Sequence, residues 1–195
     1  FWIFTIVFVL SLFAEFLAGR REQVPAAAYA LRSFLTQRDR DSVVRAARDT
    51  SFSDLRSTPS ILIGSYANEW ALRLGAELPY RFLRESERGL RWIEDADNPA
   101  SRAWSVDLSR PYSQIAADYG VLARYLDKST GRWTLMMAGL TSFATNAACE
   151  MSVTPDAMAG LAKRLPRDWA DKNLQAVLSV KLVHGAPGPV EVLAL

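Results

Sequence analysis

The chain has 195 residues, half of them hydrophobic, which suits one folded domain with an added segment. Its formal net charge is only +2, and basic residues alternate with acidic ones, as in residues 37–49 (QRDRDSVVRAARD). This pattern is typical of a solvated face, so we expect no contact with nucleic acid. The single cysteine, Cys149, excludes an internal disulfide. The single histidine, His184, leaves no Cys/His cluster, so we expect no metal site and no cofactor.

Residues 1–18 (FWIFTIVFVLSLFAEFLA) are apolar almost throughout. As a helix they would cover about 27 Å, close to the hydrocarbon core of a bilayer at about 30 Å. We therefore predict a transmembrane helix within residues 1–21 that contacts the lipid bilayer through residues 1–18. A buried core helix is disfavoured because the first ten residues show no polar stripe. A cleaved signal peptide is disfavoured because Arg20 and Arg21 follow the apolar run.

Residues 22–58 are expected to form a linker of helix and loop. Apolar residues recur at helical spacing after Pro25, which predicts a helix across residues 25–35. Residues 42–49 (SVVRAARD) fit either a short helix or a strand. Residues 50–59 (TSFSDLRSTP) are dense in Ser, Thr and Asp, which favours a loop with room for one helical turn.

Residues 59–195 carry the pattern of an α/β domain. The run SILIG, residues 60–64, is short, continuous and apolar, which predicts a strand buried on both faces of a sheet. Residues 67–75 predict a short helix, and residues 78–84 predict an edge strand. Residues 84–114 are polar and contain turn residues, so we predict no strand there.

The second half of the chain predicts two hairpins separated by two helices. The hairpin strands are residues 118–127, 133–140, 174–183 and 190–195. The helices begin at Thr141 or Ser142 and at Thr154. About five or six strands, with helices between the central ones, predict an open, mixed, largely parallel sheet flanked by helices, Rossmann-like in type.

Two segments run from a strand through a glycine into the start of a helix, residues 61–68 and 135–146. In an open parallel sheet, ligands bind beyond the carboxyl ends of the strands, where helix N-termini offer N–H groups to anions. If the two strands are neighbours, the residues that would line one ligand-binding crevice are Gly64, Ser65, Asn68, Gly139, Thr141, Ser142 and Thr145.

The segment SFSDLR would close over this crevice and would add Ser53, Asp54 and Arg56. The alternative is that each glycine only allows a strand and a helix to pack closely. Neither segment has the dinucleotide fingerprint or the P-loop, so a nucleotide is not the expected ligand.

The sequence does not assemble a set of catalytic groups. A Ser–His–Asp triad would need His184, which lies beside the turn GAPGP in an ordinary place for a solvated residue. Ser65 follows a glycine at a strand end but lacks the GxSxG context. Cys149 lies within a predicted helix, which is typical of a buried, inert thiol. We therefore do not expect an enzyme.

Three stretches resemble an uncharacterised family of bacterial membrane-anchored proteins. They are TSFSDLRSTPSILIGSYANEWALRL (residues 50–74), YGVLARYLDKSTGRWTLMMAGLTSFATNAACEM (residues 119–151) and DWADKNLQAVLSVKLVHGAPGPVEVLA (residues 168–194). Members of that family resemble a single membrane helix followed by an α/β domain outside the cytoplasm, often with a cytoplasmic winged-helix domain. The 195 residues show no winged-helix pattern.

The resemblance implies a single-pass membrane protein whose α/β domain lies in the periplasm and acts as a ligand-sensing or ligand-binding module. Arg20 and Arg21, taken alone, favour the opposite orientation. The alternative function is a non-catalytic accessory subunit that contacts other membrane proteins in a larger complex.

Overall fold

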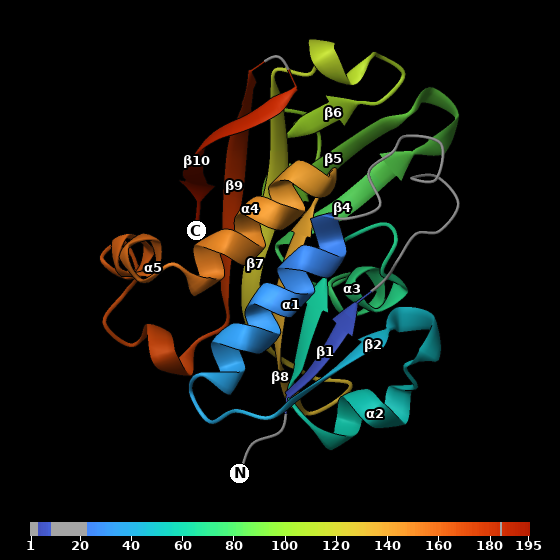
Figure 1. Ribbon diagram of the computed structural model, residues 1–195. Coiled ribbons are helices and arrows are strands. Elements are labelled where there is room, and N and C mark those ends of the chain that lie inside the picture. Colours follow the sequence, from blue (N-terminus) through green and yellow to red (C-terminus); the bar gives the residue numbers. More distant parts are fainter. Residues whose placement is uncertain (1–3, 9–22, 184) are drawn as a thin grey trace.

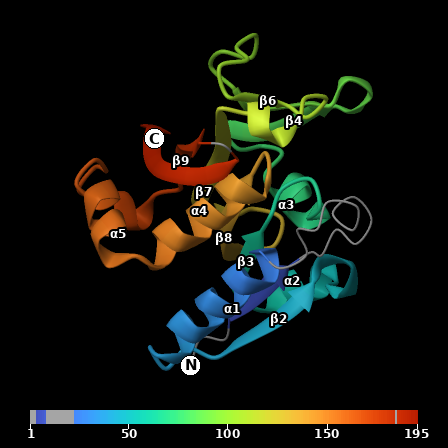
Figure 2. The same cartoon turned by 45° about the horizontal axis from the view of Figure 1, so that its top comes forward.

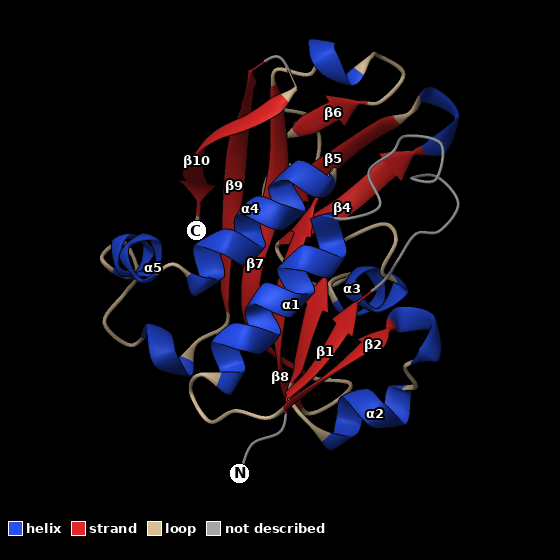
Figure 3. Ribbon diagram, viewed as in Figure 1, coloured by secondary structure: helices blue, strands red, loops and turns tan. Residues whose placement is uncertain are grey.

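The computed structural model of the protein describes residues 4–8, 23–183 and 185–195. Within them lie a seven-stranded sheet, a three-stranded sheet and the helices that cover them (Figures 1 and 3). The predicted α/β class is confirmed in this mixed form.

The larger sheet has parallel and antiparallel halves. Its strand order is β10-β9-β7-β8-β3-β1-β2. The strands are β1 (Phe4–Phe8), β2 (Ser42–Ala46), β3 (Ser60–Ile63), β7 (Ala117–Asp127), β8 (Arg132–Gly139), β9 (Leu174–Val183) and β10 (Ala186–Ala194). The pairs β1–β2, β1–β3 and β3–β8 are parallel, whereas β7–β8, β7–β9 and β9–β10 are antiparallel. The sheet is therefore less parallel than the sequence predicts.

Both predicted hairpins are present. β7 and β8 pair from Asp127 and Arg132 at the turn to Gly120 and Gly139 at the far end. The turn contains Gly131 at φ 67°, a left-handed conformation that favours glycine. A tight turn forces the two strands that it joins to run antiparallel, and β9 and β10 pair antiparallel as the second hairpin.

Helices cover both faces of the larger sheet. The helices are α1 (Gln23–Thr36), α2 (Phe52–Ser57), α3 (Glu69–Leu74), α4 (Ser142–Val153) and α5 (Pro155–Ala162). Figures 1 and 2 show α1 and α4 side by side across one face. α5 joins their core, whereas α2 and α3 contribute to the core on the other face.

Successive residues of the central strands alternate between these two cores. Leu62 and Met136 pack with Trp70 of α3, whereas Ile61 and Met137 pack with Leu31 of α1. The prediction that residues 60–64 form a strand buried on both faces is thus confirmed for β3. Residues 22–58, expected to be a linker, contribute α1, β2 and α2 to the same sheet and cores.

The smaller sheet was only partly predicted. It consists of β4 (Tyr80–Glu85), β5 (Leu90–Asp95) and β6 (Ser105–Asp107), all antiparallel. β4 matches the strand expected at residues 78–84. The expectation of no strand in residues 84–114 was wrong because β5 carries charged side chains, and these suppress the apolar alternation that marks a strand.

The N-terminal apolar run enters the sheet. Phe4–Phe8 forms β1, which pairs with β2 on one side and β3 on the other, where the sequence predicts a membrane helix. A short apolar run suits a buried parallel strand as well as a helix, since neither shows a polar period. The rest of residues 1–18 lies outside the described residues. No helix in the described ranges is both long and apolar enough to cross a bilayer. Membrane attachment and a periplasmic location stay predictions.

β10 is an edge strand with an irregular ladder. Its pairing with β9 shifts register between Pro187 and Val190, and again between Val192 and Ala194. Two prolines, Pro187 and Pro189, lie within it. Proline cannot donate to a ladder, so it is tolerated at an edge of this kind.

We predict that Ile6→Pro destabilises the domain. Proline removes a backbone N–H from a strand paired on both sides, and an unmade buried hydrogen bond costs about 1–3 kcal/mol. Chemical denaturation would measure the loss, with Ile6→Val as the control that keeps the N–H. Equal stability of the two variants would show that residues 4–8 do not belong to the sheet.

Candidate functional site

The two glycine loops lie side by side, as the sequence predicts if their strands are neighbours. β3 and β8 are adjacent and parallel, so their carboxyl ends meet at one edge of the sheet. Gly64 N donates to Met137 O at 2.9 Å, and Ser65 Oγ donates to Gly139 O at 2.5 Å. These bonds tie the loop after β3 to the end of β8.

The two glycines are required for different reasons. Gly64 has φ 91°, and a Cβ placed on it would have open space around it. At Gly139 a Cβ would lie 2.7 Å from Ala144 Cβ and would also meet Thr145 N. Gly139 therefore permits close packing of α4 on β8, which is the alternative role considered for these glycines. Gly64 instead allows the backbone to adopt a positive φ in the loop after β3, which other residues rarely do.

Polar side chains that were expected to line the crevice form hydrogen bonds within the protein. Asn68 Oδ1 caps α3 by accepting from Trp70 N and Ala71 N, while its Nδ2 donates to Ile63 O. Thr145 Oγ1 donates to Thr141 O at 3.0 Å. Ser142, half-buried at the first residue of α4, is less enclosed than Thr141. Asn68 and Thr145 thus hold the two loops in place.

A buried carboxylate, Asp118 of β7, occupies the start of α4. Its Oδ2 accepts from Thr141 Oγ1 at 2.6 Å and from Ala144 N at 2.8 Å. Its Oδ1 accepts from Thr141 N and from Tyr119 N. Burial raises the pKa of Asp118, whereas these four hydrogen bonds oppose the rise. The chain's own anion thus fills the position where the sequence placed a ligand anion.

The sequence gives no signal for this role of Asp118. The residue opens the run DYGVLARYLD, where an acidic residue looks like the polar start of a strand. Only the pairing of β7 with β8 brings it under Thr141.

The segment expected to close over the crevice lies elsewhere. Arg132, the first residue of β8, donates through Nε to Arg56 O at 2.8 Å, so Arg56 lies at the amino end of that strand. Gly139 ends the same strand seven residues later, roughly 23 Å away at strand rise. Ser53 is exposed on the same short helix, α2. The structure does not bring Ser53 and Arg56 to the two glycine loops.

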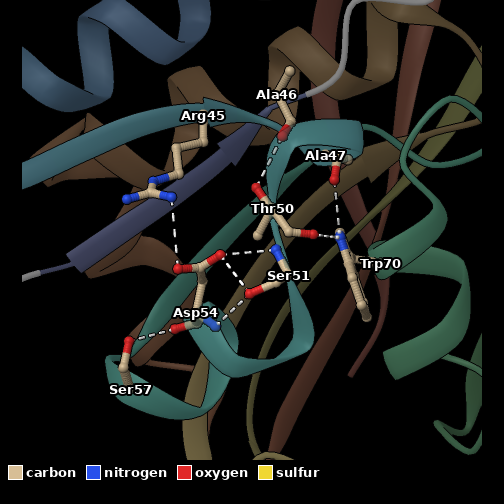
Figure 4. A network of polar contacts seen from close by, with 8 residues as sticks. All are labelled: Arg45, Ala46, Ala47, Thr50, Ser51, Asp54, Ser57 and Trp70. Carbon is tan, nitrogen blue, oxygen red and sulfur yellow. Dashed lines mark hydrogen bonds and ion pairs between the residues drawn. The ribbon is translucent and has the colours of Figure 1, made fainter.

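Asp54 has a structural role at α2. Its carboxylate accepts from Ser51 N at 2.8 Å and from Ser51 Oγ at 2.7 Å, and Arg45 Nη1 lies 3.6 Å away (Figure 4). The hydrogen bonds from Ser51 hold the pKa of Asp54 below its usual value. Trp70 Nε1 donates to Ala47 O and Thr50 O in the same network, which anchors this segment to α3.

A groove lies beside the loop after β3, between α3 and the smaller sheet. Its volume is about 580 Å³. Its lining residues come from α3 with the loops around it, and from β4 and β5: Tyr66, Ala71, Leu72, Gly75, Ala76, Arg81, Phe82, Leu83, Arg84 and Glu94. None of them was in the predicted set, although Tyr66 follows Ser65 directly.

Tyr66 connects the glycine loop to the smaller sheet. Its hydroxyl donates to Leu83 O at 2.5 Å, and its ring packs edge-on against Phe82. The guanidinium carbon of Arg91 lies 4.7 Å from the ring centroid, and that of Arg84 lies 5.5 Å from it. Burial raises the pKa of Tyr66 above its usual value, so the phenol stays neutral.

Cys149 and His184 are the other reactive groups considered from the sequence. Cys149 is buried, and burial raises the pKa of its thiol to about 12, which leaves it protonated at neutral pH. His184 lies outside the described residues. Within the described ranges, no group of three or more His, Cys, Asp or Glu side chains is placed to hold a metal ion.

Comparisons with protein-family models, with curated proteins and with solved structures find no match for this chain.

We predict that Asp118→Asn lowers the free energy of unfolding by about 1–3 kcal/mol. An amide has one accepting atom, so it leaves donors of Thr141, Ala144 or Tyr119 without an acceptor. Denaturant unfolding would measure the change. Asp156→Asn is the matched control, because Asp156 is exposed in the first turn of α5. If both variants lose the same stability, Asp118 does not hold α4 to the sheet.

Proposed function

We propose that this chain is a binding module for a small organic ligand and that the ligand lies in the groove between α3 and the smaller sheet. The observation that carries the proposal is a groove of about 580 Å³ beside the loop that leaves β3. This volume lies within the range of small-molecule sites, roughly 300–1,000 Å³.

The position of the groove supports this proposal. In open α/β sheets of the Rossmann-like kind, ligands bind beyond the carboxyl ends of parallel strands. β3 and β8 form such a pair, and Tyr66 joins the loop after β3 to the groove wall. In this proposal Ser65, Asn68 and Thr141 position the loops, whereas the groove residues contact the ligand.

The lining of the groove combines apolar surface with fixed charge. Leu72 and Phe82 offer apolar contacts. Arg81 Nε lies 2.5 Å from Glu94 Oε2, and Glu94 is only 8% exposed, so this ion pair is held in place. A mostly apolar site with a few placed polar groups is the usual composition of a small-molecule site. The proposed role is therefore ligand binding or sensing, without a catalytic step.

We predict that Ala76→Phe abolishes binding, because the larger side chain fills the groove. A thermal-shift screen of small organic acids and neutral compounds provides the ligand. A compound at a hundredfold excess over its Kd stabilises the folded state by about 2.7 kcal/mol. For a chain of this size that raises Tm by roughly 5–10 °C.

The matched control is Ala96→Phe, since Ala96 is exposed in the turn after β5 and lines no part of the groove. Hits that bind Ala76→Phe as well as the natural chain would place the ligand elsewhere. A screen without hits would contradict the proposal and would favour the alternative of an accessory subunit.

A further inference from the structure

Two arginines face each other across β4 and β5 without a carboxylate between them. The register of these antiparallel strands pairs Arg84 with Arg91. Three residues along, the same register pairs Arg81 with Glu94, which form an ion pair. Like charges directly opposite each other destabilise a sheet, whereas opposite charges stabilise it. The Arg84–Arg91 pair therefore opposes the stability of the fold.

Only some arginines of the described residues have acidic partners, and the direct cross-strand pairing of Arg84 with Arg91 is what distinguishes these two. Five arginines lie within 4 Å of a carboxylate oxygen: Arg45, Arg48, Arg81, Arg88 and Arg110. Neither Arg84 nor Arg91 has such a partner in the described ranges. The acids near them are engaged elsewhere, since Glu85 faces Arg88 and Asp118 accepts four hydrogen bonds at α4.

Most N–H donors of the two guanidinium groups have no acceptor in the described part of the chain. Each carries five N–H groups. In the described part of the chain, Arg91 Nη1 donates to Leu140 O at 2.9 Å, and Arg84 has no protein acceptor. Arg124 behaves differently, because it lies over Trp133 and donates to the carbonyl oxygens of Trp169 and Ala170. Arg124 therefore has a structural role, whereas Arg84 and Arg91 retain donors for a ligand.

Tyr66, which lines the groove, contacts both arginines of the pair. Both guanidinium groups lie over its ring, and the ring is fixed by the hydrogen bond from its hydroxyl to Leu83 O. Arg84 and Tyr66 also line the groove. Arg91 is not part of the groove lining, but its guanidinium lies over the same Tyr66 ring and donates to Leu140 O just after β8.

We infer that Arg84 and Arg91 bind the oxyanion, a carboxylate or a phosphate, of an amphipathic organic ligand whose apolar body lies in the groove. This inference rests on the proposed function and specifies the chemical class of the ligand. Arginine is suited to the role because its planar fork of donors matches both oxyanions. The bound anion neutralises the repulsion between the two guanidinium groups, and Leu72 and Phe82 contact the apolar body.

Three probes with the same apolar body test this inference: 3-phenylpropionate, phenyl phosphate and the neutral 3-phenylpropionamide. Isothermal titration calorimetry on the full chain measures each affinity. We expect at least one anionic probe to bind roughly tenfold or more tightly than the amide, as expected for charge-assisted hydrogen bonds. Its affinity should fall as salt rises. The comparison of carboxylate with phosphate identifies the preferred oxyanion.

Three variants with the same change of charge locate the site. Arg84→Gln and Arg91→Gln should each weaken the anionic probe by roughly tenfold or more, without affecting the amide. Arg88→Gln should leave its affinity within about twofold, because Arg88 lies in the exposed turn between β4 and β5. Circular dichroism verifies folding. If Arg91→Gln does not fold, the affinity of Arg84→Gln for the anionic probe serves as the test, because Arg84 is exposed.

Each contrary outcome has a distinct meaning. An amide that binds as tightly as the anions, and is lost in Ala76→Phe, would overturn the oxyanion site but keep the groove as a ligand site. Anionic binding that survives Arg84→Gln would also overturn it. Absence of binding by every probe overturns the inference, whereas the proposed function falls only if the wider screen also finds no ligand for the groove.

Discussion

One buried carboxylate connects the parts of this fold. Asp118 of β7 binds the backbone of Thr141 and Ala144, and thereby joins the antiparallel half of the sheet to the first turn of α4. Gly120 and Gly139 allow the same helix to approach closely, since a Cβ would lie 2.7 Å from Ala144 Cβ at Gly139 and 3.1 Å from it at Gly120. A charge in this position stabilises the helix N-terminus through its dipole. The loops after β3 and β8 depend on this joint, because Ser65 donates to Gly139 O.

Because Asp118 of the chain itself occupies the start of α4, the proposed ligand contacts residues farther out. In that proposal the contacts come from the smaller sheet. This sheet lies beyond the carboxyl edge of the parallel strands, and Tyr66 and Arg91 tie it to that edge (Figure 1). The loop residues Ser65, Asn68 and Thr141 form hydrogen bonds within the protein. The groove residues farther out include charged side chains, such as Arg84, and apolar ones, such as Leu72. This division separates the parts that stabilise the fold from those available for recognition.

Sequence reasoning could recover the features that depend on local pattern. The apolar run of β3 and the short helix expected at residues 67–75 each follow from a few adjacent residues. β5 was missed because Arg91 and Glu94 read as solvated charges until the register of β4 is known. The condition set for the expected crevice, that β3 and β8 are neighbours, is met, whereas the crevice itself stays a prediction. The sequence could not predict that Asp118 occupies the start of α4, because Asp118 belongs to a different strand, β7.

The two edge strands of the larger sheet, β10 and β2, differ in how readily another strand can pair with them. An exposed edge strand offers unpaired N–H groups that can template further strands. On β10, Pro187 and Pro189 lack such groups, and two shifts of register twist the ladder away from a regular edge. Val190 and Leu193 can therefore remain exposed without making this strand a nucleus for cross-β aggregation. β2 has no proline in Ser42–Ala46, so aggregation by strand addition is expected to begin at that opposite edge.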